Sequence, residues 1–171
     1  MPLVLKQVEG VKAMRLASTD KTTEQDVVTP TLFQKIRQPH SNYLLIPSVS
    51  SENREYVPIG HMTSDIIVSN LVYSISNATL YHFGILTSTM HNAWMRTVAG
   101  RLESRYRYSA NLVYNNFPWA TPTDKQTQAI EQAAQAVLDA RAQFPDASLA
   151  DLYDPRPMPA KDITPEQLLL D

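Results

Sequence analysis

Short apolar runs separated by turn-forming residues between positions 43 and 75 place the tightest limit on the fold of this chain. Four runs rich in β-branched or aromatic residues fit the strands of a small antiparallel sheet: residues 43–49, 56–59, 65–69 and 71–75. Pro47 and Pro58 lack the N–H that a central strand would donate, so we expect the first two strands to lie at an edge or to bulge there. Because the runs follow closely on one another, a β-meander is predicted.

Helical periodicity begins before these runs. In residues 3–16, the valines at 4, 8 and 11 form one apolar stripe between charged positions, and a helix with such a stripe needs a partner to cover it. Residues 18–26 are polar and unpatterned, which predicts a loop. Residues 31–37 can form a turn or two of helix, which must end before the proline at 39.

Helical signals return in the second half of the chain. Apolar residues recur every four positions up to Val98, and Ser88 is placed to cap a second helix, so one long helix or two shorter ones are expected. Thr123 followed by Gln126 has the form of a capping box for a helix to about residue 142, and a short helix is expected at 148–153. The pattern predicts an α+β fold, with a short antiparallel β-meander flanked by helices and a small helical C-terminal region.

The formal net charge of −2 hides an asymmetry along the chain. Up to Ala110 there are 11 basic and 8 acidic residues, whereas the remainder has 4 basic and 9 acidic ones. We therefore expect two parts that face different surroundings, residues 1–110 and residues 111–171. Residues 96–108 form the most basic window, which is either a solvated helix face or a surface for a polyanion.

The composition excludes several kinds of chemistry. There is no Cys for a disulfide or thiolate site, and the four Gly are too scattered for a nucleotide-binding loop. The four His include no pair spaced to bind one metal ion from a helix, so we expect no metal site. No pattern places a general base beside a Ser to activate it as a nucleophile, so we expect no catalytic residue. No apolar stretch is long enough to span a membrane and no signal peptide is visible, which predicts a soluble, cytoplasmic protein without a membrane partner.

Two segments carry side chains suited to a polyanion. A loop rich in Ser and Asn runs from Ser48 to Arg54, and arginines and tyrosines are dense between residues 96 and 108. Hydroxyl, amide and guanidinium groups are the ones that contact phosphates and base edges in DNA. On a helix, Arg101 and Arg105 would lie one turn apart on one face, although Arg101 could instead lay its aliphatic stem over the core.

Several motifs are more specific than these patterns: Tyr-Leu-Leu-Ile-Pro ending at Pro47, Tyr-Val-Pro-Ile-Gly ending at Gly60, Asn-Ala-Thr-Leu-Tyr-His-Phe-Gly ending at Gly84, Tyr-Arg-Tyr-Ser ending at Ser109 and Tyr-Asn-Asn-Phe-Pro-Trp ending at Trp119. Through them the chain resembles the carboxy-terminal part of MmeI-like proteins, which are type IIG restriction-modification enzymes and related DNA adenine methyltransferases. The resemblance covers roughly residues 3–158. It implies that residues to about 109 are the later part of a target-recognition domain, followed by a helical tail.

This resemblance implies a DNA sequence-recognition fragment. It would position double-stranded DNA for an S-adenosylmethionine-dependent methyltransferase domain that is absent from this chain and that methylates adenine N6. The chain itself would then be neither an enzyme nor a cofactor-binding protein, while the parent would be an adenine-specific DNA methyltransferase, with or without endonuclease activity. The positions expected to contact DNA are Ser50, Ser51, Asn53, Arg54, Arg101, Tyr106, Arg107, Tyr108 and Ser109. The alternative is a structural module that docks onto a neighbouring domain without touching DNA.

Overall fold

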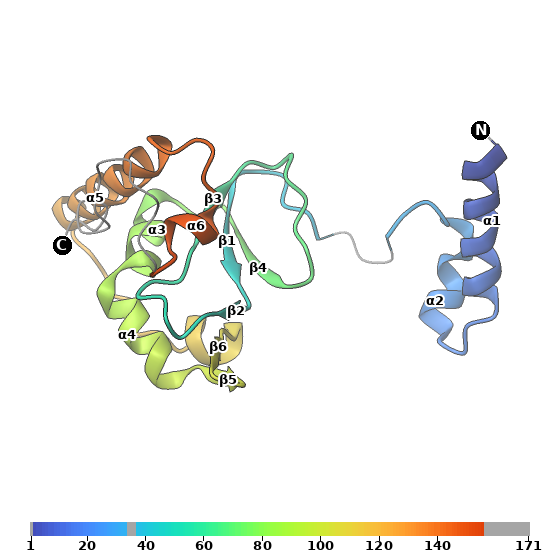
Figure 1. Cartoon of the computed structure of the whole chain (residues 1–171), viewed down its shortest axis with the longest axis horizontal. Coiled ribbons are helices and arrows are strands. Elements are labelled where there is room, and N and C mark those ends of the chain that lie inside the picture. The colour runs from blue at the N-terminus through green and yellow to red at the C-terminus, as the bar shows by residue number, and fades with distance from the viewer. Residues whose placement is uncertain (1, 34–36, 156–171) are drawn as a thin grey trace. The chain divides into compact units, whose positions relative to one another are not determined.

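The computed structural model describes residues 2–33 and 37–155 and divides into two compact units, Met1–Gln38 and Pro39–Asp171 (Figure 1). The first unit is helical. The second contains two small antiparallel sheets together with helices. The predicted α+β class is therefore confirmed.

The first unit begins with α1 (Pro2–Leu16), which confirms the helix predicted there. A loop was expected next, but the chain instead forms the short helix α2 (Lys21–Gln25) and the 3-10 turn η1 (Asp26–Val28). The reason is local, because the carboxylate of Asp20 accepts hydrogen bonds from two backbone N–H groups of the first turn and so starts α2. The prediction of a loop over residues 18–26 is wrong.

Arg15 joins the pieces of this unit. Its guanidinium donates to the backbone oxygens of Asp26, Thr29 and Leu32, at 2.5, 2.9 and 2.8 Å. The valine stripe of α1 is covered only in part, since Val4 remains 62% exposed while the valines at 8 and 11 are half-buried. Residues 31–33 and 37 are not helical, and positions 34–36 of the predicted turn lie outside the described residues.

The first sheet is built around β1 (Tyr43–Pro47), which pairs antiparallel with β3 (Gly60–Met62) on one side and β4 (Val72–Ser76) on the other. The expectation that the first strand lies at an edge is wrong. Pro47 is nevertheless tolerated, because it is the last residue of the strand. Residues 56–59 and 65–69 are not strands, and the sheet order β3-β1-β4 is not a meander.

The chain changes sheets at Ser48. Its N–H donates to the oxygen of Leu71 at 3.0 Å, beside β4, whereas its own oxygen accepts from the N–H of Tyr108 at 2.9 Å. Next to it, β2 (Val49–Ser50) pairs with β6 (Arg105–Arg107), and β6 pairs with β5 (Gly100–Leu102). The single strand predicted over residues 43–49 is therefore two strands in two different sheets.

The helices of the second unit begin where the sequence indicates. Ser88 separates α3 (Leu80–Thr87) from α4 (Thr89–Val98), and its hydroxyl accepts from the N–H of His91 as an N-cap. Thr123 and Gln126 form the predicted capping box of α5 (Asp124–Ala142). The short helix α6 (Leu149–Leu152) confirms the last expected helix. A π-helix, η2 (Ala110–Tyr114), precedes α5.

One buried cluster joins residues of β1, β6, α3, α4, η2 and α5. The segment after Trp119 takes part in it, because α5 packs against α3 (Figure 1). Arg141 on α5 extends this contact by donating to the backbone oxygen of Ile59 at 2.8 Å and to the hydroxyl of Tyr153. No helix in residues 2–33 or 37–155 combines the length and apolar character required to cross a membrane.

Candidate nucleic-acid interface

Basic and aromatic side chains alternate along β6. Arg105 and Arg107 are exposed, whereas Tyr106 and Tyr108 are 9% and 3% exposed. Successive side chains of a strand project to opposite faces, so the two arginines share the outer face while the tyrosines anchor the strand in the core. The surface formed by Arg105 and Arg107 is called the β6 arginine pair below.

The other arginine of this hairpin lies on the opposite face. Arg101 is the cross-strand partner of Tyr106, and residues paired in this way project to the same side of a sheet. Its guanidinium carbon is 3.8 Å from the centre of the Tyr106 ring, and its Nη1 donates to the oxygen of Ser104 at 2.8 Å. The expectation that Arg101 and Arg105 share a helix face is wrong, because these residues form a β-hairpin.

The loop after β2 approaches the tip of this hairpin. The hydroxyl of Ser104 hydrogen-bonds to Glu52, and this bond, reinforced by the nearby charges of Arg101 and Arg105, holds the pKa of the Glu52 carboxyl below its usual range. At the hairpin tip, Arg105 also pairs with Glu103 at 2.7 Å. The loop and the hairpin therefore form one continuous polar surface.

The predicted residues of this loop have different surroundings. Ser50 is only 4% exposed, and it pairs with Tyr106 in the second sheet. The Ser51 hydroxyl accepts from the N–H of Asn53, and the side chain of Asn53 is exposed. The guanidinium of Arg54 donates to the oxygen of Ala150 in α6 at 3.4 Å. Among these four, the amide of Asn53 is best placed to contact a ligand.

The remaining predicted positions form hydrogen bonds within the chain. The Ser109 hydroxyl accepts from the N–H of Leu112 and caps η2. Tyr108 is buried, and its hydroxyl lies 3.0 Å from Nε2 of His91. Arg96, which belongs to the same basic stretch of sequence, donates to the backbone oxygen of Glu55. These side chains organise the surface, whereas the β6 arginine pair and Asn53 are exposed on it.

Burial shifts the pKa values of the His91 and Tyr108 pair. Loss of water lowers the pKa of His91 to about 4, so its imidazole is neutral at pH 7. Loss of water also raises the pKa of the Tyr108 phenol, with a smaller contribution from the nearby Tyr114. The pair is therefore an uncharged hydrogen bond at neutral pH.

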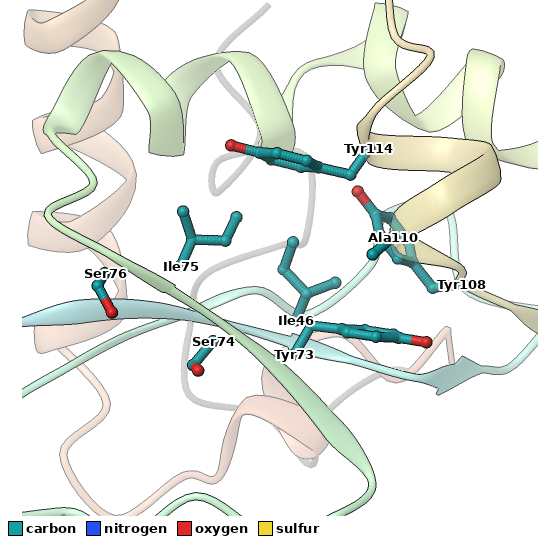
Figure 2. A pocket seen from close by; sticks show the side chains of 8 residues that line it. All are labelled: Ile46, Tyr73, Ser74, Ile75, Ser76, Tyr108, Ala110 and Tyr114. Carbon is teal, nitrogen blue, oxygen red and sulfur yellow. The ribbon is translucent and has the colours of Figure 1, made fainter. Parts of the chain in front are cut away.

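A hollow of about 320 Å³ lies beside Tyr108. Figure 2 shows the rings of Tyr73, Tyr108 and Tyr114 around it, with Ile46 and Ile75 pointing in from the first sheet. The hollow is partly open to solvent.

Arg105 is not among the positions predicted from the sequence to contact DNA, although the structure places it on the same face as Arg107. The alternation Arg-Tyr-Arg-Tyr over residues 105–108 was the available signal, because a period of two indicates a strand with one basic face. The helical interpretation of residues 96–108 concealed it. The sequence offers no signal for the contact of His91 with Tyr108, because that contact depends on the tertiary fold.

Comparison with known proteins matches most of the chain. The family model "MmeI, target recognition domain" matches residues 1–121, and the model "MmeI, C-terminal domain" matches residues 122–167. The boundary between the two models follows residue 121, which is 11 positions after the division at residue 110 that the charge distribution predicts. The division at residue 110 stays a prediction. Together the models match residues 1–167.

Individual relatives are similar over nearly the whole chain. DNA methyltransferase A of Bacillus subtilis (strain 168) is 42% identical over 158 residues, which are 92% of this chain and 18% of that protein. A solved structure of the Type IIL restriction-modification enzyme MmeI in complex with DNA is 56% identical and has a TM-score of 0.83. The similarity to that structure covers 93% of this chain and 21% of MmeI. The chain therefore spans about a fifth of the length of these relatives.

Proposed function

This chain belongs to the MmeI family, and from this we propose that it binds double-stranded DNA and recognises its sequence as the target-recognition part of a longer restriction-modification protein. The longer protein would carry a methyltransferase domain, with S-adenosylmethionine as methyl donor and adenine as the methylated base. This chain would hold the duplex while that domain acts on a base taken out of the stack.

The observation that carries this proposal is the outer face of β6. The β6 arginine pair is exposed on a strand that the inward tyrosines hold in the core, and the exposed Asn53 belongs to the neighbouring loop. Guanidinium groups bind phosphates and base edges, and they do so most specifically when the backbone that presents them is rigid. Phosphate contacts would set the position of the duplex, and base-edge contacts would supply the specificity.

Salt dependence of DNA binding tests the proposal. Binding of the full chain to a fluorescently labelled duplex is measured by anisotropy over a series of salt concentrations. The double variant Arg105→Ala/Arg107→Ala should bind more weakly, and the slope of log K against log salt should fall by about 2, because two positive charges that lie close to the phosphates are lost whether each guanidinium bonds to a phosphate or to a base edge. Lys125→Ala is the control, since it removes an exposed positive charge in the segment matched by the C-terminal domain model.

The control variant should bind as the unchanged chain does. Absence of duplex binding by the folded chain, or equal salt slopes for the double variant and the unchanged chain, would contradict the proposal. Circular dichroism on each variant establishes that the fold is retained.

A second candidate function is docking onto a neighbouring domain without contact to DNA. The acidic composition after residue 110, with 4 basic and 9 acidic residues, favours it. Two single variants separate the functions. Arg54→Ala disturbs a contact to α6, whereas Arg107→Ala removes an exposed charge. Both variants are tested in the longer protein: loss of sequence recognition in Arg107→Ala at a retained fold favours DNA recognition by this chain, and unchanged recognition in both variants favours docking without DNA contact.

A further inference from the structure

A buried hydrogen bond joins α4 to the residue that follows β6. His91 is 1% exposed and Tyr108 is 3% exposed, and His91 Nε2 lies 3.0 Å from the Tyr108 hydroxyl. The rings of Phe117 and His91 pack edge to face, with 4.7 Å between ring centres. Either tautomer of the imidazole can complete the bond, because a hydroxyl both donates and accepts.

Tyr108 lies at the junction of the two sheets. Its N–H donates to the oxygen of Ser48, where the chain passes from the first sheet to the second, and its neighbour in sequence is Arg107. A shift of the Tyr108 side chain would therefore move the end of β6 and the guanidinium beside it. Tyr108 is thus the residue that directly follows the strand carrying the β6 arginine pair.

The packing around the Tyr108 ring leaves unfilled space on one side. One side of the ring borders the hollow of about 320 Å³ (Figure 2). Tyr73 lies across this region, with its ring centre 6.2 Å from that of Tyr108. Because side chains can move into unfilled space, the hydrogen bond to His91 restricts where the hydroxyl end of the ring can lie.

We propose that His91 is a positioning residue for DNA sequence recognition, acting through Tyr108 on the orientation of the β6 arginine pair. This inference rests on the proposed function. Phosphate contacts tolerate small displacements of a charge, whereas hydrogen bonds to base edges require a defined geometry. Loss of the His91–Tyr108 bond should therefore reduce sequence discrimination more than overall DNA affinity.

The test uses substitutions on either side of the hydrogen bond. Tyr108→Phe removes only the hydroxyl, and His91→Leu removes the imidazole. In His91→Gln the side-chain amide can take the place of the imidazole toward the Tyr108 hydroxyl. Tyr114→Phe is the control, because it removes a hydroxyl from the same hollow and leaves the His91–Tyr108 bond in place.

Each full-length variant is incubated with a pool of duplexes that has a randomised central segment, and bound DNA is sequenced. Tyr108→Phe and His91→Leu should reduce the preference at one or two adjacent base pairs by roughly tenfold, the range of one base contact. Affinity for the unselected pool should change less, because the arginine charges remain. His91→Gln and Tyr114→Phe should keep the original preference.

The double variant His91→Leu/Tyr108→Phe separates positioning from simple stability. Removing both polar partners leaves no buried group unpaired, so its Tm should recover relative to the single variants. The inference requires that its base preference nevertheless stays reduced. Recovery of both Tm and preference, or an unchanged preference in folded Tyr108→Phe, would show that the bond is structural only. Absence of any duplex binding by the unchanged chain would instead overturn the proposed function itself.

Discussion

Gly84 of α3 lies directly against Ile130 of α5. A Cβ atom on Gly84 would stand 2.7 Å from Cγ2 of Ile130, 3.1 Å from its backbone oxygen and 3.3 Å from Cβ of Ala134. Contacts this short are possible only because glycine has no side chain. α5 therefore packs against α3 at a position where any residue larger than glycine would clash.

Gly84→Ala should therefore destabilise the chain. We expect a loss of about 1–3 kcal/mol in the free energy of unfolding, because the extra methyl group meets both a side chain and a backbone oxygen. Urea unfolding followed by circular dichroism measures this change. Gly10→Ala is the control, since Gly10 is in α1 with no atom within 4 Å of the added Cβ, and that change should stabilise its helix by about 0.5–1 kcal/mol. Equal effects at the two positions would contradict this account of the helix contact.

Arg101→Ala should affect stability more than DNA binding. The Arg101 guanidinium covers the ring of Tyr106 on the face opposite Arg105 and Arg107, so its removal uncovers an aromatic anchor of β6. A loss of about 0.5–1 kcal/mol is expected for such an exposed contact. The measurement compares thermal unfolding with the salt slope of DNA binding, and Arg107→Ala is the matched variant. A salt slope reduced as much as in Arg107→Ala would show that Arg101 contacts phosphate.

Glu103→Gly should stabilise the hairpin between β5 and β6. Glu103 has a φ of 57°, in the left-handed region that most side chains avoid, and glycine adopts this conformation without strain. Its ion pair with Arg105 is exposed and contributes little, so a gain of up to about 1 kcal/mol is expected. Glu103→Ala serves as control, because it removes the ion pair without relieving the backbone. A larger gain in the alanine variant than in the glycine variant would exclude strain as the cause.

Stability should fall with acid through the titration of His91. Burial lowers the folded-state pKa of His91 from 6.5 to about 4, so between these values the unfolded state binds more protons than the folded state. The contribution of His91 is complete above pH 6.5 and is lost as pH falls toward 4, up to about 3 kcal/mol. Denaturant unfolding at a series of pH values measures this dependence.

His91→Gln is the reference for that experiment, because glutamine does not titrate. Carboxyl groups such as Glu52 and Asp151, whose pKa values are lowered by hydrogen bonds to Ser104 and Ser148, contribute equally in both proteins. The difference between the two curves therefore isolates His91. Parallel curves from pH 7 to pH 4 would show that the imidazole does not titrate as its burial requires.

The helix starts were predictable because they depend on neighbouring residues. Ser88 and Thr123 each accept a hydrogen bond from a backbone N–H three residues later, and this pattern is visible in a linear sequence. Asp20 acts in the same way, although residues 18–26 lack the apolar pattern that would indicate a helix there. Motifs around Gly84 and Trp119 pointed to the MmeI family, and the family models match the corresponding residues.

The strand partners were not predictable in this way. β1 pairs with β4, and β2 pairs with β6, and both partners lie far along the chain. The period of two in residues 105–108 indicates a strand, whereas the spacing of Arg101 and Arg105 also fits a helix. Pairing of β6 with β2 and β5 makes this segment a strand. The separation of site residues into exposed and buried groups followed from that pairing.

The sequence by itself determined where the main helices begin, the α+β class and the family, because caps, periodicity and motifs act through residues close in the chain. Only the tertiary structure decided that the chain changes sheets at Ser48, that Arg105 and Arg107 share an outer face while Arg101 does not, and that His91 meets Tyr108. These relationships arise from hydrogen bonds between distant segments, whose formation depends on the burial of the whole core. A local pattern in the sequence does not contain that information.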